Sequence, residues 1–377
     1  MTDNNENKVL NVPHLRFPEF SGEWKKCKLG DLCNVLMCKR ILVSQTNTED
    51  GVPFYKIGTI GSTPDAYISK ELFDDYKVKY NYPRKGEVMI TCAGTVGKCV
   101  VYDGEDAYFQ DSNIVWIDNP TQYISNGFLF HLLSKVDWRK LNSTTIIRIY
   151  NDDLRNLKMS YPRKEEQQKI SHLLSLLDER IATQNKIIED LKKLKSAIAE
   201  TVFNNMQGNL TNLSAICNIV KGKQVNGEEL SEKGKYYVMN GGITPSGYYD
   251  QCNTPANTIS VSEGGNSCGY VQYNKSSFWS GGHCYTLQDI TSGVDTQYLF
   301  HYLKRYESNI MNLRIGTGLP NIQKKDLENF RITLPPSNVQ KEISTCLTAI
   351  EDKIMVEVKW LDSAQKEKLY LLRQMFI

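Results

Sequence analysis

Residues 162–206 read PRKEEQQKISHLLSLLDERIATQNKIIEDLKKLKSAIAETVFNNM, and this stretch decides the fold. Apolar residues recur along it at alternating intervals of four and three, at Ile170, Leu174, Leu177, Ile181, Ile188, Leu191, Ile198 and Val202. The pattern is interrupted only at Gln184 and Lys195, so it predicts a long amphipathic helix that packs along a heptad seam. Pro162 suits the start of this helix, and Gly208 lies just past its end.

The C-terminal stretch PPSNVQKEISTCLTAIEDKIMVEVKWLDSAQKEKLYLLRQMFI, residues 335–377, repeats this pattern. Adding 173 to each seam position gives Ile343, Leu347, Ile350, Ile354, Leu361, Ala364, Leu371 and Met375. The same offset pairs Pro162 with Pro335 and Gln167 with Gln340. A constant offset across a proline and a heptad indicates two copies of one element. The alternative is a pair of unrelated amphipathic helices.

The composition of the chain is that of an ordinary globular protein with balanced charge. Its 377 residues allow two or three domains, and 45 Lys plus Arg stand against 43 Asp plus Glu. Any contact with nucleic acid must therefore come from local basic faces. The sequence has no run of 18 apolar residues, and the polar segment after Met1 is not typical of a secretory signal. We expect a cytoplasmic protein with a disordered tail over residues 1–12.

The 10 cysteines form no CxxC pair and no Cys/His cluster with the spacing of metal ligands. Several of them, such as Cys92 and Cys217, lie inside apolar runs, where a reduced cysteine acts as a small hydrophobic residue. We therefore predict reduced structural thiols and no metal site.

The segments between the two predicted helices also occur twice. Short β-type runs with turn residues fill residues 52–118 and return in the second half, and LFH at 129–131 recurs at 299–301. Asp326 and Leu327 stand where Asp153 and Leu154 stand in the first half. The repeat predicts an α+β chain of two similar globular domains, each followed by a long helix.

This duplication predicts a pseudo-two-fold internal repeat in which the two long coiled-coil helices run antiparallel and separate the globular domains. The expected boundaries are a globular domain over 13–161, a helix over 162–207, a globular domain over 208–334 and a helix over 335–377.

The polar loops differ between the copies although the scaffold positions agree. CAGTVGK at 92–98 stands opposite EGGNSCG at 263–269, and KIGTIGST at 56–63 stands opposite MNGGITPSG at 239–247. Small residues that allow close approach, mixed with amide, hydroxyl and basic side chains, suit contacts with phosphates and base edges. Such residues are also common in loops because turns require them.

The duplicated unit resembles the DNA-specificity subunit of Type I restriction-modification enzymes over essentially the whole chain. The most similar parts are GTGLPNIQKKDLENFRITLPPSNVQKEI at 316–343 and its first-half counterpart IYNDDLRNLKMSYPRKEEQQKI at 149–170. The opening HLRFPEFSGEWKKCKLGDL, residues 14–32, is also similar. The first half departs from the pattern in having TTIIRIYN where the second half has GTGLP.

The resemblance implies that the globular domains are target-recognition domains, each of which reads one half of an asymmetric bipartite site in double-stranded DNA. It implies that the helices set the unread spacer and dock two methyltransferase subunits, and that two restriction subunits join for cleavage. It places no cofactor on this chain; AdoMet, ATP and Mg are expected on the partner subunits. Bacterial cytoplasm, with association to the nucleoid through DNA, is the implied location.

We predict that DNA contacts come from basic, amide, hydroxyl and imidazole side chains in the loops of both halves. Those of the first half are Lys39, Arg40, Lys56, Thr59, Thr95, Lys98, Thr145 and Arg148. Those of the second half are Lys221, Lys223, Asn240, Thr244, Asn266, His283, Arg314, Thr317, Asn321, Lys324 and Lys325. Lysines are expected mainly at phosphates, and Arg, Asn and Thr mainly at base edges.

The sequence predicts no catalytic residue of its own. Asn119-Pro120 lacks the proline and aromatic residue that follow the catalytic Asn of an amino-methyltransferase, and EGGNSCG opens no recognisable helix as a dinucleotide or AdoMet loop would. Asp65 with Asp75 and Lys77 matches a loose nuclease pattern, but residues 72–77 otherwise indicate a solvated surface segment. The competing hypotheses are an assembly scaffold that binds no DNA and, third, a standalone nuclease.

Overall fold

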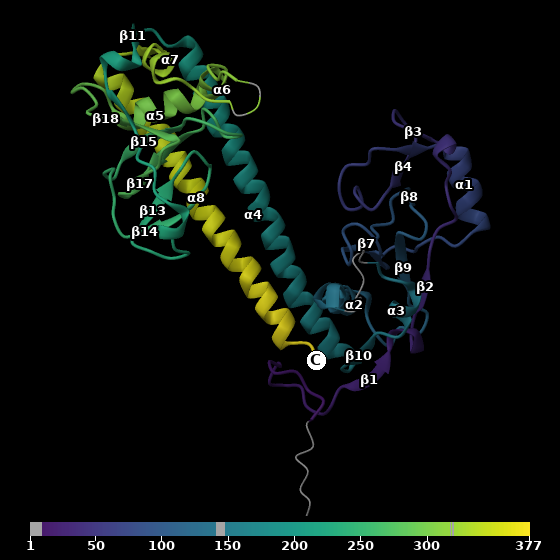
Figure 1. Ribbon diagram of the computed structural model, residues 1–377. Coiled ribbons are helices and arrows are strands. Elements are labelled where there is room, and N and C mark those ends of the chain that lie inside the picture. Colours follow the sequence, from purple (N-terminus) through teal and green to yellow (C-terminus); the bar gives the residue numbers. More distant parts are fainter. Residues whose placement is uncertain (1–9, 141–147, 317, 319) are drawn as a thin grey trace, which may run out of the picture. The chain divides into compact units, whose positions relative to one another are not determined.

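The computed structural model describes residues 10–140, 148–316, 318 and 320–377. It divides into two compact units that share the two long helices (Figure 1). Unit 1 runs to Thr183 and includes Leu361–Ile377, and unit 2 is Gln184–Trp360. Each long helix therefore contributes one of its halves to each unit.

Unit 1 begins with short strands and ends with the first half of a long helix. Its elements before that helix are β1 Lys25–Lys28, η1 Leu29–Asp31, β2 Asn34–Leu36, η2 Val43–Gln45, β3 Thr46–Asn47, β4 Val52–Tyr55, β5 Tyr67–Ile68, α1 Lys70–Lys79, β6 Val88–Thr91, β7 Cys99–Val101, β8 Tyr108–Phe109, β9 Ile114–Asp118, α2 Asn126–Lys135, η3 Trp138–Lys140, α3 Asn151–Arg155 and β10 Lys158–Tyr161.

Unit 2 contains the corresponding elements in the same order, apart from β3 and α1, and it has α6 where unit 1 has η3. They are β11 Asn209–Asn212, η4 Leu213–Ala215, β12 Asn218–Lys221, η5 Gly227–Glu229, β13 Tyr236–Met239, β14 Gly247–Tyr249, β15 Thr258–Ser262, β16 Val271–Asn274, β17 Trp279–Ser280, β18 Cys284–Gln288, α5 Thr296–Arg305, α6 Glu307–Met311, α7 Lys324–Glu328 and β19 Arg331–Leu334. The long helices are α4 Lys164–Asn205 and α8 Ser337–Gln374.

The two units share the topology of one four-stranded sheet, whereas the second sheet has four strands in unit 1 and three in unit 2. A four-stranded sheet has the order β2-β9-β6-β7 in unit 1 and β12-β18-β15-β16 in unit 2, with antiparallel pairing throughout. The second sheet contains one parallel pair in each unit, β4 with β8 and β13 with β17. The first strand of each unit pairs with the last one before the long helix, β1 with β10 and β11 with β19. The predicted α+β duplication is confirmed.

The helices α2 and α5 cover the larger sheets and begin at polar caps. The side chains of Ser125 and Asp295 accept hydrogen bonds from the backbone N–H groups of Phe128 and Tyr298, which satisfies donors that a helix start leaves open. The buried faces of these helices belong to one apolar cluster in each unit, and the same clusters include Leu174 of α4 and Leu347 of α8. In each unit, the four-stranded sheet of shared topology thus packs, together with α2 or α5, against the first part of a long helix.

The long helices pack through the predicted seam, including its polar positions. Gln184 is 1% exposed, and its amide donates a hydrogen bond to the Glu357 carboxylate; these positions differ by the repeat offset of 173. In unit 2, Lys195 Nζ of α4 pairs with Glu351 of α8 at 3.1 Å. In unit 1, Lys368 of α8 pairs with Asp178 of α4, and the offset of 173 relates Lys195 to Lys368 and Asp178 to Glu351. Each unit therefore contains one lysine–carboxylate pair of this kind between antiparallel stretches of α4 and α8.

Two equivalent glutamines join each globular part to the helix that follows it. The Gln167 amide receives the Ser125 N–H at 2.7 Å and donates to the carbonyls of Tyr123 and Pro162. Gln340 receives the Asp295 N–H at 2.9 Å and donates to the carbonyls of Gly293 and Pro335. Both glutamines are buried, so each bond replaces one that water would otherwise make.

The N-terminal segment contacts Glu166 at the start of α4. Unit 2 lacks this contact, because Val339 stands at the position of Glu166. The Arg16 guanidinium forms a bidentate pair with the buried Glu166 carboxylate, both bonds being 2.7 Å long. Residues 1–9 of the predicted tail lie outside the described residues. Asn11, however, is buried and donates a 2.6 Å hydrogen bond to the Trp24 carbonyl.

Residues 72–77, predicted as a solvated surface segment, expose Asp74, Asp75 and Lys77. These residues belong to helix α1, which Ser69 caps, and Phe73 on its inner face is fully buried. The sequence pattern does not indicate the buried face of this helix, because four of the six residues in LFDDYK are polar or carry a polar group.

Candidate nucleic-acid interface

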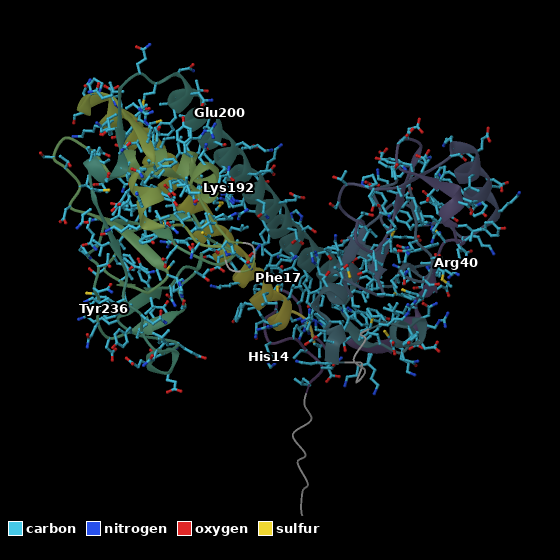
Figure 2. All side chains as sticks on the ribbon, turned by 45° about the horizontal axis from the view of Figure 1, so that its top comes forward. His14, Phe17, Arg40, Lys192, Glu200 and Tyr236 are labelled. Atoms are coloured by element: carbon cyan, nitrogen blue, oxygen red, sulfur yellow. The ribbon has the colours of Figure 1, made fainter. Side chains whose placement is uncertain are left out.

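Loop residues of unit 1 surround a hollow of about 430 Å³, which we call hollow 1. Its lining is Arg40, Ile41, Val43, Thr46, Phe54, Lys56, Ala66, Gln110, Asp111, Ser112, Asn113 and Arg148. The predicted contacts Arg40, Lys56 and Arg148 thus come together from three separate segments. Arg40 is labelled in Figure 2.

The cations of hollow 1 are held by contacts that a phosphate can replace. Arg40 Nε lies 2.9 Å from Asp111 Oδ2, and the Arg40 side chain is 66% exposed. Lys56 Nζ lies 2.8 Å from Asp65 Oδ1, while Arg148 Nη2 donates to the Ser112 carbonyl at 3.0 Å. Exposed ion pairs contribute only about 0–1 kcal/mol, so exchange of the carboxylate for another anion costs little.

Unit 2 contains a larger hollow of about 630 Å³, hollow 2. Its lining is Lys221, Asn240, Gly241, Gly242, Glu263, Gly264, Gly265, Asn266, Ser267, His283, Pro320 and Asn321. The predicted contacts Lys221, Asn240, Asn266, His283 and Asn321 are among them. Three asparagines and four glycines are among the residues that line hollow 2, whereas hollow 1 has no glycine and includes the cations Arg40, Lys56 and Arg148.

The backbone hydrogen bonds show that the two hollows occupy equivalent places. In unit 1, Cys92 N–H donates to the Asn113 carbonyl at 2.7 Å, and Ile149 N–H donates to the Cys92 carbonyl at 2.8 Å.

In unit 2 the same two bonds join Glu263 to His283 at 2.9 Å and Ile322 to Glu263 at 2.8 Å. Asn113 therefore corresponds to His283, and Arg148, which precedes Ile149, corresponds to Asn321. Equivalent positions of the scaffold thus have different side chains in the two units.

A buried carboxylate forms the floor of hollow 2. The Glu263 side chain is 10% exposed, and its Oε1 lies 2.6 Å from Lys221 Nζ and accepts the Tyr285 hydroxyl at 3.1 Å. Its Oε2 is buried and has no hydrogen-bond partner among the residues that the structure describes, although His283 Nδ1 lies 3.6 Å away.

Four other predicted contacts of unit 1, Lys39, Thr59, Thr95 and Lys98, do not line hollow 1. Thr59 Oγ1 accepts the Lys56 N–H at 3.0 Å, and Thr95 Oγ1 donates to the Ile57 carbonyl at 3.2 Å, so both hydroxyls stabilise the loop between β4 and β5. Lys98 donates to the Ile60 carbonyl, and Lys39 Nζ lies 5.4 Å above the ring of Tyr80. Thr145 lies outside the described residues.

Five other predicted contacts of unit 2, Lys223, Thr244, Arg314, Lys324 and Lys325, do not line hollow 2. The carbonyl of exposed Lys223 accepts the Trp279 indole N–H at 2.8 Å, and Thr244 and Arg314 are exposed in loops. Lys324 and Lys325 are exposed on α7, where Lys324 pairs with Glu328 at 3.6 Å. Thr317 lies outside the described residues.

Sequence reasoning missed Gln110, Asn113, Glu263 and Ser267, which line the hollows. Asn113 was detectable, because the offset of 170 that relates the two LFH motifs carries His283 onto it. The repeat does not identify Glu263 in this way, because its counterpart is Cys92. Residue type does not identify it either, because a carboxylate repels the phosphates of DNA.

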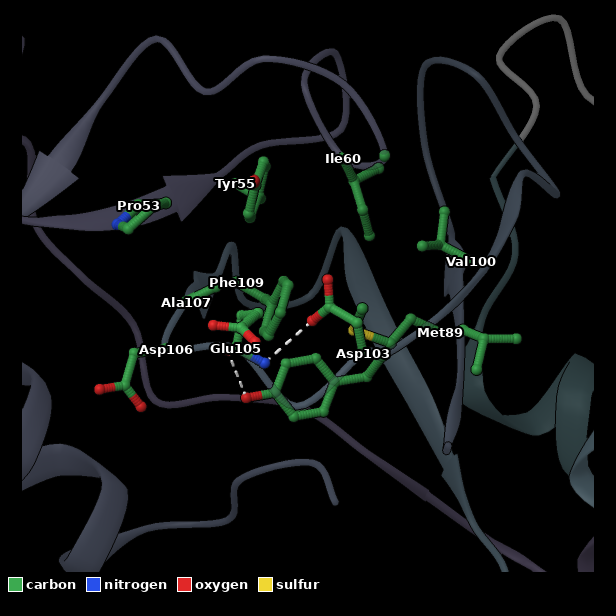
Figure 3. Close-up of a pocket in the computed structure, with 13 residues that line it drawn as sticks. Pro53, Tyr55, Ile60, Met89, Val100, Asp103, Glu105, Asp106, Ala107 and Phe109 are labelled. Carbon is green, nitrogen blue, oxygen red and sulfur yellow. Dashed lines mark hydrogen bonds between the residues drawn. The ribbon is translucent and has the colours of Figure 1, made fainter. Parts of the chain in front are cut away.

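A third pocket, in unit 1, has the wrong electrostatic character for DNA. Figure 3 shows it lined by apolar and aromatic side chains such as Tyr55, Met89 and Phe109, with the carboxylates of Asp103, Glu105 and Asp106 at one side. It is small, at about 140 Å³. Carboxylates repel phosphate groups, so we do not include this pocket in the candidate interface.

The described residues give no support to a nuclease or metal centre. Asp65 pairs with Lys56 and Asp75 pairs with Lys79, and the part of the chain that the structure describes contains no group of three or more His, Cys, Asp or Glu that could hold a metal ion. Burial raises the pKa of the Cys92 and Cys217 thiols to about 12, so both are unreactive at neutral pH.

The two equivalent histidines pack against the long helices. His131 Nε2 lies 3.4 Å from Ser175 Oγ of α4, and His301 Nε2 lies 2.9 Å from Thr348 Oγ1 of α8, positions that again differ by 173. Burial lowers the pKa of His131 to about 4 and that of His301 to about 3.

A membrane-spanning helix needs a long apolar stretch, and none of the helices in the described residues has one.

A family model described as the Type I restriction modification DNA specificity domain matches residues 21–193 and again residues 209–361. A protein of Haemophilus influenzae named as a type I restriction enzyme specificity subunit is 46% identical over 184 residues, which is 49% of this chain and 45% of the relative. A protein of Mycoplasma pneumoniae named as a type I specificity subunit is 34% identical over 144 residues, 38% of each chain. The chain thus spans less than half the length of these two relatives.

The crystal structure of a Type-I restriction-modification system S subunit from M. genitalium has the same fold, with a TM-score of 0.74. It is 20% identical, and the match covers 97% of this chain and 99% of that one.

Proposed function

The chain belongs to the Type I restriction modification DNA specificity family, two copies of whose domain cover most of its length, and from this premise we propose that it is the sequence-specific DNA-binding subunit of such a complex. Each globular part reads one half of a bipartite asymmetric site in double-stranded DNA. The helices α4 and α8 set the number of unread base pairs between the halves.

The partners in this proposal are two methyltransferase subunits, which dock on the long helices, and two restriction subunits. AdoMet, ATP and Mg belong to those subunits, and this chain contributes no catalytic residue and holds no cofactor. The complex acts in the bacterial cytoplasm, on nucleoid DNA.

The observation that carries this proposal is the placement of hollow 1 and hollow 2. They sit at the same position of a duplicated scaffold, yet Asn113 and Arg148 in one correspond to His283 and Asn321 in the other. A scaffold that only joined proteins would not require different chemistry at equivalent positions. A protein that reads two different half-sites would require it, because base edges are distinguished by their donor and acceptor patterns.

The test is the methylation motif of cells that carry this protein with its methyltransferase partner. We expect a two-part motif, and purified complex should bind a duplex containing both halves but not one in which the spacer is one base pair longer or shorter. Absence of any DNA binding by the complex would instead favour an assembly scaffold, and Mg²⁺-dependent cleavage by the chain alone would favour a nuclease.

Arg148→Ala provides a variant matched to this test. Loss of one cationic contact should weaken binding by about 1–3 kcal/mol and lower the slope of log affinity against log salt by about one. Arg155→Ala on α3, where Arg155 pairs with Asp152, serves as the exposed control. Equal effects of the two substitutions would remove hollow 1 from the interface.

A further inference from the structure

The carboxylate of Glu263 is poorly explained by the packing of unit 2. It follows directly after β15, at the position that Cys92 occupies in unit 1. Cys92 demonstrates that this place in the scaffold accepts an apolar side chain. A carboxylate there is therefore not required by the fold.

Burial of half of this carboxylate without a hydrogen bond is unfavourable. Lys221 and Tyr285 satisfy Oε1, whereas Oε2 is buried without a hydrogen-bond partner among the described residues. A buried acceptor that lacks a donor destabilises the free protein. A ligand in hollow 2 would offset this cost only if the Glu263 side chain turned Oε2 toward it, because that oxygen is covered in the free protein.

The walls of hollow 2 leave room for a flat ligand group. A Cβ added to Gly265 would meet no atom within 4 Å, and its backbone φ of +77° is one that side chains rarely adopt. The amide side chains of Asn240, Asn266 and Asn321 line the same space. Lys221 and His283 flank the carboxylate, so a phosphate backbone nearby does not meet an isolated negative charge.

We infer that Glu263 is a specificity-determining residue that accepts a hydrogen bond from the exocyclic amino group of a cytosine or adenine in the half-site read by unit 2. This inference rests on the proposed function. In the major groove those two bases present an amino donor, whereas guanine and thymine present a carbonyl oxygen at the corresponding place. A carboxylate accepts hydrogen bonds only, so it favours the amino bases and repels the keto bases.

The first experiment measures binding of wild-type complex to duplexes in which single bases lack the amine, with 2-pyrimidinone for cytosine and purine for adenine. Exchange of residues 1–160 with those of another family member identifies the half-site that unit 2 reads. At one position of that half-site, removal of the amine should weaken binding roughly 10- to 100-fold. Equal binding at every position of that half-site would overturn the inference.

The second experiment uses Glu263→Gln, because an amide can donate as well as accept. We expect the methylation motif of this variant to admit G or T at the same single position, with the other half unchanged. Glu232→Gln, an exposed glutamate of the same unit, is the control and should leave the motif unchanged.

A folded Glu263→Gln complex that keeps the wild-type base preference would overturn the inference. If the variant does not fold, the amine scan on wild-type complex decides alone. A wild-type complex that shows no two-part motif would contradict the proposed function itself. A two-part motif without an amine-dependent position in the unit 2 half would contradict only the role of Glu263.

Discussion

Unit 1 and unit 2 agree in their interior and differ at their loops. One four-stranded sheet has the same strand order in both units, and Gln167 and Gln340 make the same three bonds to their surroundings. Hollow 1 presents three cations, whereas hollow 2 presents a buried carboxylate, three asparagines and a run of glycines. The glutamine junctions are thus the same in both units, whereas the residues that line the two hollows differ.

The helix contacts explain how divergence is tolerated. Phe203 near the end of α4 packs on Tyr298 of unit 2, and Phe376 just past the end of α8 packs on Phe128 of unit 1, with centroid separations of 5.9 and 4.8 Å. Each sheet is therefore held by the start of one long helix and the end of the other. The loops around the hollows take no part in these contacts.

Exchange of one globular part would test this comparison most severely. Replacement of residues 13–161 by those of another family member should change one half of the methylation motif completely and leave the other half intact, because the interior contacts are common to both units. Sequencing of modified bases in the genome measures the outcome. A change in both halves would show that the units do not read DNA independently.

Removal of the equivalent glutamines should have the next largest effect. Gln167→Ala and Gln340→Ala each leave three backbone groups without a partner, so each should lower the free energy of unfolding by about 2–4 kcal/mol. Chemical denaturation measures both values, and Gln168→Ala, an exposed neighbour, is the control. A large loss for one glutamine and none for the other would break the equivalence of the two units.

The buried histidines predict a smaller effect that depends on pH. Since the folded pKa values are about 4 for His131 and about 3 for His301, the unfolded chain binds more protons than the folded chain as pH falls below the ordinary value of 6.5. Stability should therefore decrease from about pH 6.5 toward pH 4, by about 2 kcal/mol for each histidine at pH 5.

His131→Gln and His301→Gln should each flatten the dependence of the unfolding free energy on pH, as measured by denaturation between pH 5 and 7.5. His172→Gln, on the exposed face of α4, should leave that dependence as in the wild type. A slope that neither buried substitution changes would mean that these imidazoles are hydrated in solution.

Much of the candidate interface was predicted from the loops of the repeat. Arg40, Lys56, Arg148, Lys221, Asn240, Asn266, His283 and Asn321 were chosen by residue type and position, and they line the two hollows; whether they contact DNA stays a prediction. The Thr59 and Thr95 hydroxyls, also chosen by residue type, form hydrogen bonds with backbone groups of Lys56 and Ile57, and whether they contact DNA stays a prediction too. Chain order does not reveal whether a hydroxyl faces inward to a carbonyl or outward to a ligand.

The sequence by itself determined the duplication, the long helices and their seam, because heptad spacing and a constant offset are properties of chain order. It also indicated that Gln184 and Lys195 interrupt the apolar pattern. Tertiary structure alone decided that these residues meet Glu357 and Glu351, that α1 buries Phe73, and that Glu263 lies beneath a hollow. Burial and hydrogen bonding depend on which distant segments approach one another, and a local pattern of residues contains no record of that approach.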